Sequence, residues 1–192
     1  MDRRRGIISA QGGAQPAPVI PDEYQRVAYI GIPNKSFTGV ETHIRAQEIK
    51  KVILEADVST TPDETVSVFF LTTSNSFKLG WFSNYAYLKG FTCSPSVAKN
   101  ASANGTFTFT IDGNQSAQTN PIYLFGGTSS MGNSVRSRNL HCSHAWMEDA
   151  SGNTIYDAVP VYRKTDNKIG LWDFVSQQFE PSHGSPTKGA DV

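Results

Sequence analysis

Cysteine, long apolar runs and net charge are scarce in this sequence, and each scarcity excludes a class of protein. Only Cys93 and Cys142 occur, far apart and among polar residues, which fits neither a zinc ribbon nor a disulfide framework. We interpret both as free thiols, with one bridge between them as the alternative. No apolar run approaches the roughly 18 residues of a membrane-spanning helix, so we expect no membrane partner.

The charges of the chain cancel, because Lys and Arg together number 17 and Asp and Glu together also number 17. A domain that binds nucleic acid normally carries a basic field over part of its surface. The balance therefore predicts that nucleic acid is not a partner.

Helix signals are weak as well, and short strand-like runs take their place. From Tyr24 onward, runs rich in Val, Ile, Thr, Phe and Tyr alternate with a period of two and are separated by Gly, Asn, Asp and Pro. In 106–111, three apolar residues alternate with three threonines, followed by a hairpin-type Asp-Gly-Asn turn. In 49–58, Val52, Leu54, Ala56 and Val58 point one way while Lys51, Glu55 and Asp57 point the other. We expect strands at 25–32, 40–46, 49–58, 65–72, 77–82, 84–90, 106–111, 121–126, 139–147, 154–163 and 168–174.

These strands with close turns and no internal repeat predict an all-β protein: a two-sheet antiparallel jelly-roll sandwich with an extended N-terminal arm. We place the arm at residues 1–22 and the jelly-roll domain at residues 23–192. The arm is rich in Gly and Pro and cannot build its own core. It is either a disordered tail or a segment that orders on a larger partner, and its candidate docking residues are Arg3, Arg4, Arg5, Ile7 and Ile8.

The stretch VPVYRKTDNKIGLWD, residues 159–173, forms two strand-like runs around a polar turn. We expect a turn at 166–167, a bulge or close backbone approach at Gly170, and a surface pair between Arg163 and Asp173. The apolar residues expected to fill the core are Val159, Val161, Ile169 and Leu171.

Residues 144–181, which contain this hairpin, resemble the closing hairpins of a concanavalin A-like, laminin-G-like jelly-roll domain. Residues 24–40 and 121–127 resemble its opening strand and its central core strand. The chain departs from the family pattern at 180–183 and 33–36, both in expected loops. Such domains are frequent in phage structural proteins and in surface proteins of their bacterial hosts.

The resemblance implies a virion protein at the particle surface, in a capsid decoration or a fibre, attached to other virion proteins through the arm. A homo-oligomer is compatible with this role. The alternative class is a bacterial cell-surface carbohydrate-binding module or a glycoside hydrolase-like protein.

Glucanases of this fold place two catalytic carboxylates on one strand, in the pattern Glu-x-Asp-x-Glu or with one more residue before the last Glu. This chain has Glu55 and Asp57, but Ser59 stands where the last carboxylate belongs. A hydroxyl cannot protonate a leaving group near neutral pH. We therefore predict no catalytic residue and no enzyme activity, with Glu55 and Asp57 on a solvated strand face.

Two polar stretches are candidate metal sites. In HCSH, residues 141–144, strand alternation places His141 and Ser143 on one face and Cys142 and His144 on the other, which is too few ligands for zinc. The acidic stretch at 148–153 is typical of a hairpin turn, with calcium as the open alternative. We expect no metal and no cofactor.

The remaining candidate site is aromatic. The stretch 78–90 gathers tryptophan, phenylalanine and tyrosine around an asparagine, and sugar rings stack on such side chains while their hydroxyls need polar partners. The alternative is that half of these aromatics fill the core. The candidate glycan-binding or host-attachment residues are Trp81, Asn84, Tyr85, Tyr87 and, on a polar loop, Arg136.

Overall fold

The computed structural model describes residues 19–33, 37–58, 71–74, 77–79, 91–94, 103–111, 120–126 and 140–192. The helical element among them is one 3-10 turn, η1 at Ala46–Glu48, and the all-β prediction is confirmed. No described helix is long and apolar enough to span a bilayer. The strands are β1 (Tyr24–Arg26), β2 (Ile30–Ile32), β3 (Gly39–Arg45), β4 (Lys51–Val58), β5 (Leu71–Ser74), β6 (Phe77–Leu79), β7 (Phe91–Ser94), β8 (Ala103–Ile111), β9 (Pro121–Leu124), β10 (Leu140–Glu148), β11 (Thr154–Arg163), β12 (Lys168–Asp173), β13 (Gln178–His183) and β14 (Thr187–Lys188).

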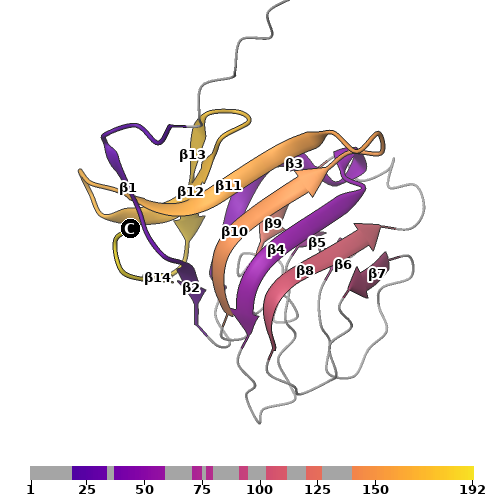
Figure 1. The fold of residues 1–192 in the computed structure, drawn as a ribbon, viewed down its shortest axis with the longest axis horizontal. Coiled ribbons are helices and arrows are strands. Elements are labelled where there is room, and N and C mark those ends of the chain that lie inside the picture. Colours follow the sequence, from indigo (N-terminus) through magenta and orange to yellow (C-terminus); the bar gives the residue numbers. More distant parts are fainter. Residues whose placement is uncertain are drawn as a thin grey trace, which may run out of the picture.

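The strands form one 14-stranded antiparallel sheet that curls back on itself, in the order β6-β5-β9-β3-β13-β12-β11-β10-β4-β8-β7. Off this path, β1 pairs with β11, and β2 pairs with both β10 and β14. Strands β10, β4 and β8 lie in front of β3, β9 and β5 (Figure 1). This curled arrangement is compatible with a β-sandwich.

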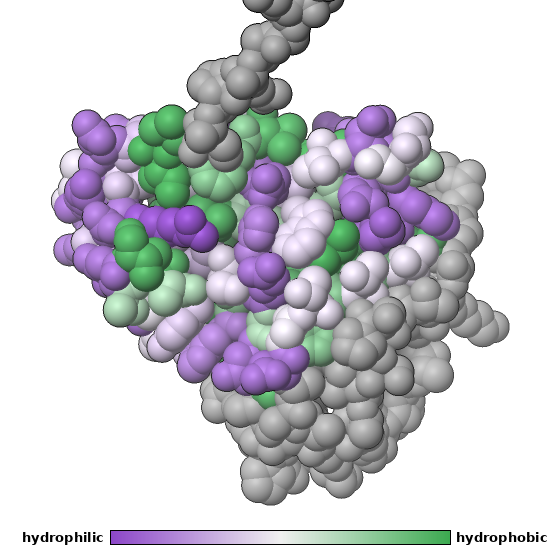
Figure 2. All heavy atoms as spheres, in the orientation of Figure 1, coloured by the Kyte–Doolittle hydropathy of each residue, from purple (hydrophilic) through white to green (hydrophobic). Residues whose placement is uncertain are grey.

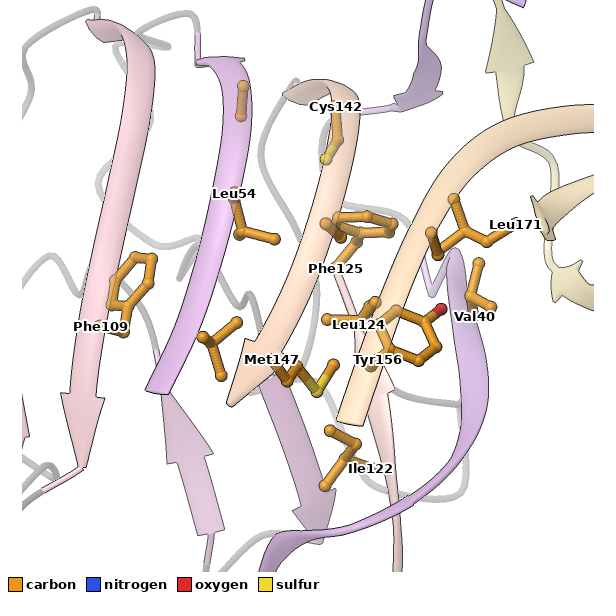
Figure 3. Close-up of a cluster of buried hydrophobic side chains, with 14 of the residues drawn as sticks. Val40, Leu54, Phe109, Ile122, Leu124, Phe125, Cys142, Met147, Tyr156 and Leu171 are labelled. Carbon is orange, nitrogen blue, oxygen red and sulfur yellow. The ribbon is translucent and has the colours of Figure 1, made fainter. Parts of the chain in front are cut away.

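The main core lies between the front and rear parts of the sheet. On β4, the four apolar residues expected to point inward are buried, whereas Glu55 and Asp57 are exposed. On β8, Phe107, Phe109 and Ile111 are buried and Thr106 is exposed. The inward faces of β4, β9, β10 and β11 meet in one cluster (Figure 3). The period-two predictions for both front strands are confirmed.

The β11–β12 hairpin is buried on both faces. Leu171 belongs to the main core and Ile169 packs against it, as predicted. Val159 and Val161 are also buried, but they face a second cluster around Trp172 on the opposite side of the sheet. Ile20, Tyr24, Phe174 and Phe179 pack against this cluster, and the Tyr24 ring lies 5.0 Å from both Trp172 and Phe179.

The predicted pairing of Arg163 with Asp173 is wrong. Arg163 donates from Nε and from Nη2 to the two carboxylate oxygens of Asp166, at 3.1 and 2.6 Å, and so closes the turn beside Asn167. Asp173 is fully buried and accepts hydrogen bonds from the backbone N–H groups of Asp157, Val175 and Ser176. A buried carboxylate needs such donors, and strand alternation alone does not reveal them.

A second buried carboxylate ties distant strands together. Glu180 on β13 accepts hydrogen bonds from the backbone N–H of His43 on β3, at 2.9 Å, and from the hydroxyl of Tyr156 on β11, at 2.7 Å. The imidazole Nδ1 of His43 lies 2.8 Å from the same carboxylate. Burial raises the pKa of Glu180 despite these hydrogen bonds. Glu180 therefore joins β3 and β11 on either side of the bend in the sheet.

The structure differs from the expected strand list in a few places. Strands β7, β13 and β14 were not predicted, and the expected strand at 25–32 is split between β1 and β2. The strand expected at 84–90, most of the one expected at 65–72, and the turn after β8 lie outside the described residues, as do residues 1–18 of the arm. The predicted β11 matches its observed bounds, and β12 ends one residue earlier than expected.

We expect Gly170→Ala to destabilise the protein. A Cβ at this position would overlap the carbonyl oxygen of Glu180 and lie 2.7 Å from the Phe179 ring, which confirms the predicted close approach. Forcing an atom into packed structure costs about 1 to 3 kcal/mol, which urea unfolding followed by tryptophan fluorescence will measure. Gln178→Ala, at an exposed position on the neighbouring β13, is the control and should change stability by no more than about 0.5 kcal/mol. Equal stability of the two variants would contradict the close approach.

Glu180→Gln should change the pH dependence of stability in a defined direction. Because burial raises the folded-state pKa of Glu180, the folded protein holds this proton more tightly than the unfolded chain. The contribution of this proton to the free energy of unfolding is complete below the pKa that Glu180 has in the unfolded chain. It is lost as pH rises through the pKa that Glu180 has in the folded protein. The stability of Glu180→Gln relative to the unmodified protein should therefore increase as pH rises from about 4 towards 7.

Asp166→Asn supplies the contrast, because the Arg163 guanidinium lowers the pKa of Asp166 to about 2. The Asp166 carboxylate contributes to the free energy of unfolding above the pKa that it has in the unfolded chain, and this contribution is lost as pH falls. The difference in stability between Asp166→Asn and the unmodified protein should therefore change with pH only below about pH 4. Urea unfolding across this pH range measures both variants. A flat difference curve for Glu180→Gln would contradict the assignment.

Candidate functional site

A β-bulge in β10 changes which face its polar residues reach. The register of β10 against β4 shifts between Cys142, which pairs with Ala56, and His144, which pairs with Glu55. Ser143 is the extra residue of the bulge, and alternation restarts after it. Cys142 consequently points into the core, while His144 joins His141 on the outer face. The prediction that Cys142 and His144 share a face is wrong for this reason.

The outer face of β10 and β4 is a grid of polar residues in cross-strand register. Asp57 lies opposite His141, and Glu55 lies opposite His144. Nε2 of His144 lies 2.6 Å from a carboxylate oxygen of Asp157 on β11, so the next strand continues the row. In Figure 2 the surface over β10, β4 and β8 is mostly purple and pale, with little green. This side of the sheet faces solvent.

A pocket of about 450 Å³ opens on this face. Ala28, Ala56 and Gly105 form part of its lining, and Gly105 leaves open space where a side chain would stand. Its polar and aromatic lining consists of Tyr29, Glu55, Asp57, Thr106, His141 and Ser143. The pocket therefore combines two carboxylates, two hydroxyls, an imidazole and a phenol ring.

One wall of the pocket is a stacked ring pair. The rings of Tyr29 and His141 lie 4.1 Å apart and 17° from parallel. Tyr29 comes just before β2, whose Gly31 pairs with His141 on one side and with Thr187 of β14 on the other. A Cβ at Gly31 would overlap Thr187 and press on the His141 ring. Glycine at this position allows the three strands to hold the wall together.

Two carboxylates in the pocket differ from their neighbours. On the same outer face, Glu148 forms an ion pair with Lys51 at 2.5 Å, and Asp157 is paired with His144. Within the described part of the chain, no hydrogen bond or ion pair reaches the carboxylates of Glu55 and Asp57. No Lys or Arg lines the pocket among these residues either. Among the described residues, the two pocket carboxylates are therefore unpaired, whereas Glu148 and Asp157 on the same face have side-chain partners.

Some of the candidate residues lie together in the structure, and others fall outside the described residues. Glu55, Asp57, His141 and Ser143 line one pocket. The sequence does not single out Tyr29 as a site residue. For the bulge in β10 it does offer a signal, the run HCSH at 141–144, which does not alternate between apolar and polar residues. The candidate glycan residues Trp81, Asn84, Tyr85, Tyr87 and Arg136 lie outside the described residues, as do Arg3, Arg4, Arg5, Ile7 and Ile8 of the arm.

The acidic stretch at 148–153, a candidate metal site, is hydrogen-bonded within its own turn. Among the described residues, no three His, Cys, Asp or Glu side chains gather as metal ligands would. The Asp149 carboxylate accepts hydrogen bonds from the backbone N–H groups of Ser151 and Asn153 and from the Asn153 side chain, at 2.8 to 2.9 Å. The acidic stretch after β10 is thus a hairpin turn, as the sequence favoured.

Cys142 is a free thiol in the core, as expected. It is fully buried beneath the bulge, and burial raises the pKa of its thiol to about 12. A protonated thiol is neither a good nucleophile nor a good metal ligand. Cys142 therefore takes no part in chemistry at the pocket.

Comparisons with protein-family models, with curated proteins and with solved structures find no match to this chain.

Cys142 should resist thiol reagents as long as the protein is folded. In a Cys93→Ser variant, which leaves Cys142 as the remaining thiol, we expect dithionitrobenzoate at pH 8 to react only when urea unfolds the protein. Burial and the raised pKa both slow the native reaction. Rapid stoichiometric labelling without denaturant would show that the thiol reaches solvent and would contradict its placement in the core.

Proposed function

We propose that this protein is a non-catalytic glycan-contact module with a concanavalin A-like jelly-roll fold, carried on a phage particle. The pocket on the outer face of β4 and β10 is the observation that carries the glycan part of the proposal. The virion part rests on the resemblance of residues 144–181, 24–40 and 121–127. The curled antiparallel sheet is compatible with that fold.

The lining of the pocket matches what a sugar requires. A flat ring pair can pack against the apolar C–H face of a sugar, and Tyr29 and His141 provide one. Carboxylates and hydroxyls bind sugar hydroxyls, and Glu55, Asp57 and Thr106 stand beside the rings. Its volume of about 450 Å³ falls within the roughly 300 to 1,000 Å³ of small-ligand pockets. It is large enough for one or two sugar units.

Hydrolysis is the second candidate, because Glu55 and Asp57 both line a pocket of this size. A retaining glycosidase needs one carboxylate as nucleophile and a second group that is protonated at working pH. The family pattern takes that acid from the position where this chain has Ser59. We therefore assign Glu55 and Asp57 to contact with the ligand and not to bond cleavage.

For the virion role, residues 1–22 are the proposed attachment segment. Ile20 and Tyr24 pack against the Trp172 cluster, and Nζ of Lys164 donates to the carbonyl oxygen of Asp22 at 2.7 Å. The base of the arm is thus fastened to the β11–β12 hairpin, which lets a partner bound to the arm hold the whole domain. Deletion of residues 2–18 should abolish incorporation into particles and leave glycan binding intact.

Glycan binding should depend on the ring wall of the pocket. On a printed array of bacterial cell-wall and capsular oligosaccharides, we expect the full chain to bind, and Tyr29→Ala and His141→Ala to weaken binding by roughly two- to tenfold. A lost aromatic contact is worth about 0.5 to 1.5 kcal/mol. His144→Ala is the matched control, because His144 is also an imidazole on the outer face of β10 but does not line the pocket.

Three results would overturn this proposal. Absence of any bound glycan would remove the function itself. Loss of binding in Trp81→Ala with full binding in His141→Ala would move the contact surface to the stretch around residues 81–87. Release of reducing sugar by the unmodified protein, abolished in Glu55→Gln or Asp57→Asn, would establish catalysis.

A further inference from the structure

We propose that the outer-face pocket prefers sugars that carry a free, protonated amine. This inference rests on the proposed glycan contact and specifies its ligand. It starts from the two carboxylates, Glu55 and Asp57, that stand side by side on β4 beside a ring wall.

The first argument is the charge balance of the pocket. Elsewhere on this face the carboxylates have partners, because Glu148 forms an ion pair with Lys51 and Asp157 lies 2.6 Å from Nε2 of His144. At the pocket, no Lys or Arg of the described residues is part of the lining beside Glu55 and Asp57, and the His141 ring is stacked on Tyr29. Two like charges on one strand face repel each other. A cationic ligand relieves that repulsion, whereas a neutral ligand does not.

The second argument is the shape of the wall. Tyr29 and His141 are nearly parallel, with their ring centroids 4.1 Å apart, and both rings line the pocket. Aromatic faces attract both sugar C–H groups and cations. An amino sugar offers both at once, because its ammonium group is attached to the same ring whose C–H face stacks. N-acetylation keeps the stack and removes the charge.

The third argument is the space beside the carboxylates. Gly105 on β8 lies next to Ala56 and has nothing within 4 Å of the position where a Cβ would stand. Ala28 is also small, so among the described residues no long side chain from Gly105 or Ala28 enters the pocket beside the two carboxylates. A substituent as large as an ammonium group can therefore approach Glu55 and Asp57 directly.

The test compares two oligosaccharides that differ only in the amine. Titration calorimetry with hexamers of glucosamine and of N-acetylglucosamine is carried out at pH 6 in EDTA, which removes calcium as a bridging ion. We expect the glucosamine hexamer to bind about tenfold more tightly, equivalent to about 1.4 kcal/mol and in the range of two exposed ion pairs. Raising NaCl from 0.05 to 0.5 M should erase most of that preference, because salt screens exposed charges.

Variants locate the preference. Asp57→Asn and Glu55→Gln should reduce the ratio of the two affinities towards one while leaving the N-acetylglucosamine hexamer bound. Asp157→Asn is the matched control, because its carboxylate lies on the same face but is paired with His144 and lies outside the pocket. That variant should keep the full tenfold ratio.

The outcomes separate this inference from the proposed function. Equal binding of the two hexamers, weakened alike by His141→Ala, would leave the glycan contact standing and overturn the amine preference. A preference that survives in the Asp57→Asn, Glu55→Gln double variant would also overturn it. Binding of neither hexamer, together with an empty glycan array, would remove both proposals.

Discussion

The bend of the sheet depends on a buried carboxylate, that of Glu180, which is shielded from solvent. Glu180 is almost fully buried, and its oxygens are hydrogen-bonded to the backbone of β3 and to the hydroxyl of Tyr156 on β11. A buried acceptor without donors costs about 1 to 3 kcal/mol, and a charged one costs more. The two hydrogen bonds are directional, so they favour arrangements of β3 and β11 in which both donors reach the Glu180 side chain. Apolar contacts alone would tolerate many angles.

Asp173 has a complementary role one strand away. It is buried and satisfies the tight turn between β12 and β13 through the backbone N–H groups of Val175 and Ser176. This turn fixes where β13 begins and therefore the position of Glu180 on that strand. Two acidic residues that look like surface residues in the sequence thus define the geometry of the C-terminal strands.

The sequence predicts those parts of the fold that depend on one strand at a time. Alternation in β4 and β8 is readable because each strand has one wet and one dry face. The hairpin of β11 and β12 is readable for its length and turn, but its second buried face is not, because Ile20 and Tyr24 cover it from far away in the chain. The partner of Arg163 is not readable from strand alternation, because Asp166, three residues on, accepts hydrogen bonds from both Nε and Nη2.

The candidate site follows the same division. Glu55 and Asp57 were recognised as neighbours on an exposed strand face, which needs only the period of two. Their meeting with His141 and Tyr29 requires the register of β4 against β10 and of β2 against β10. A bulge shifts that register by one residue, and single-sequence patterns rarely locate a bulge. The pocket is therefore a property of strand pairing between distant segments.

That origin gives the pocket a thermodynamic meaning. Tyr29 and His141 belong to segments more than a hundred residues apart. Their rings stack only when β2 is paired with β10 on one side and with β14 on the other. Any molecule that contacts both rings therefore binds only the folded protein, in which β2 is paired with β10 and β14. Ligand binding and the pairing of these strands are linked equilibria. A ligand at a hundred times its Kd would add about 2.7 kcal/mol to the free energy of unfolding.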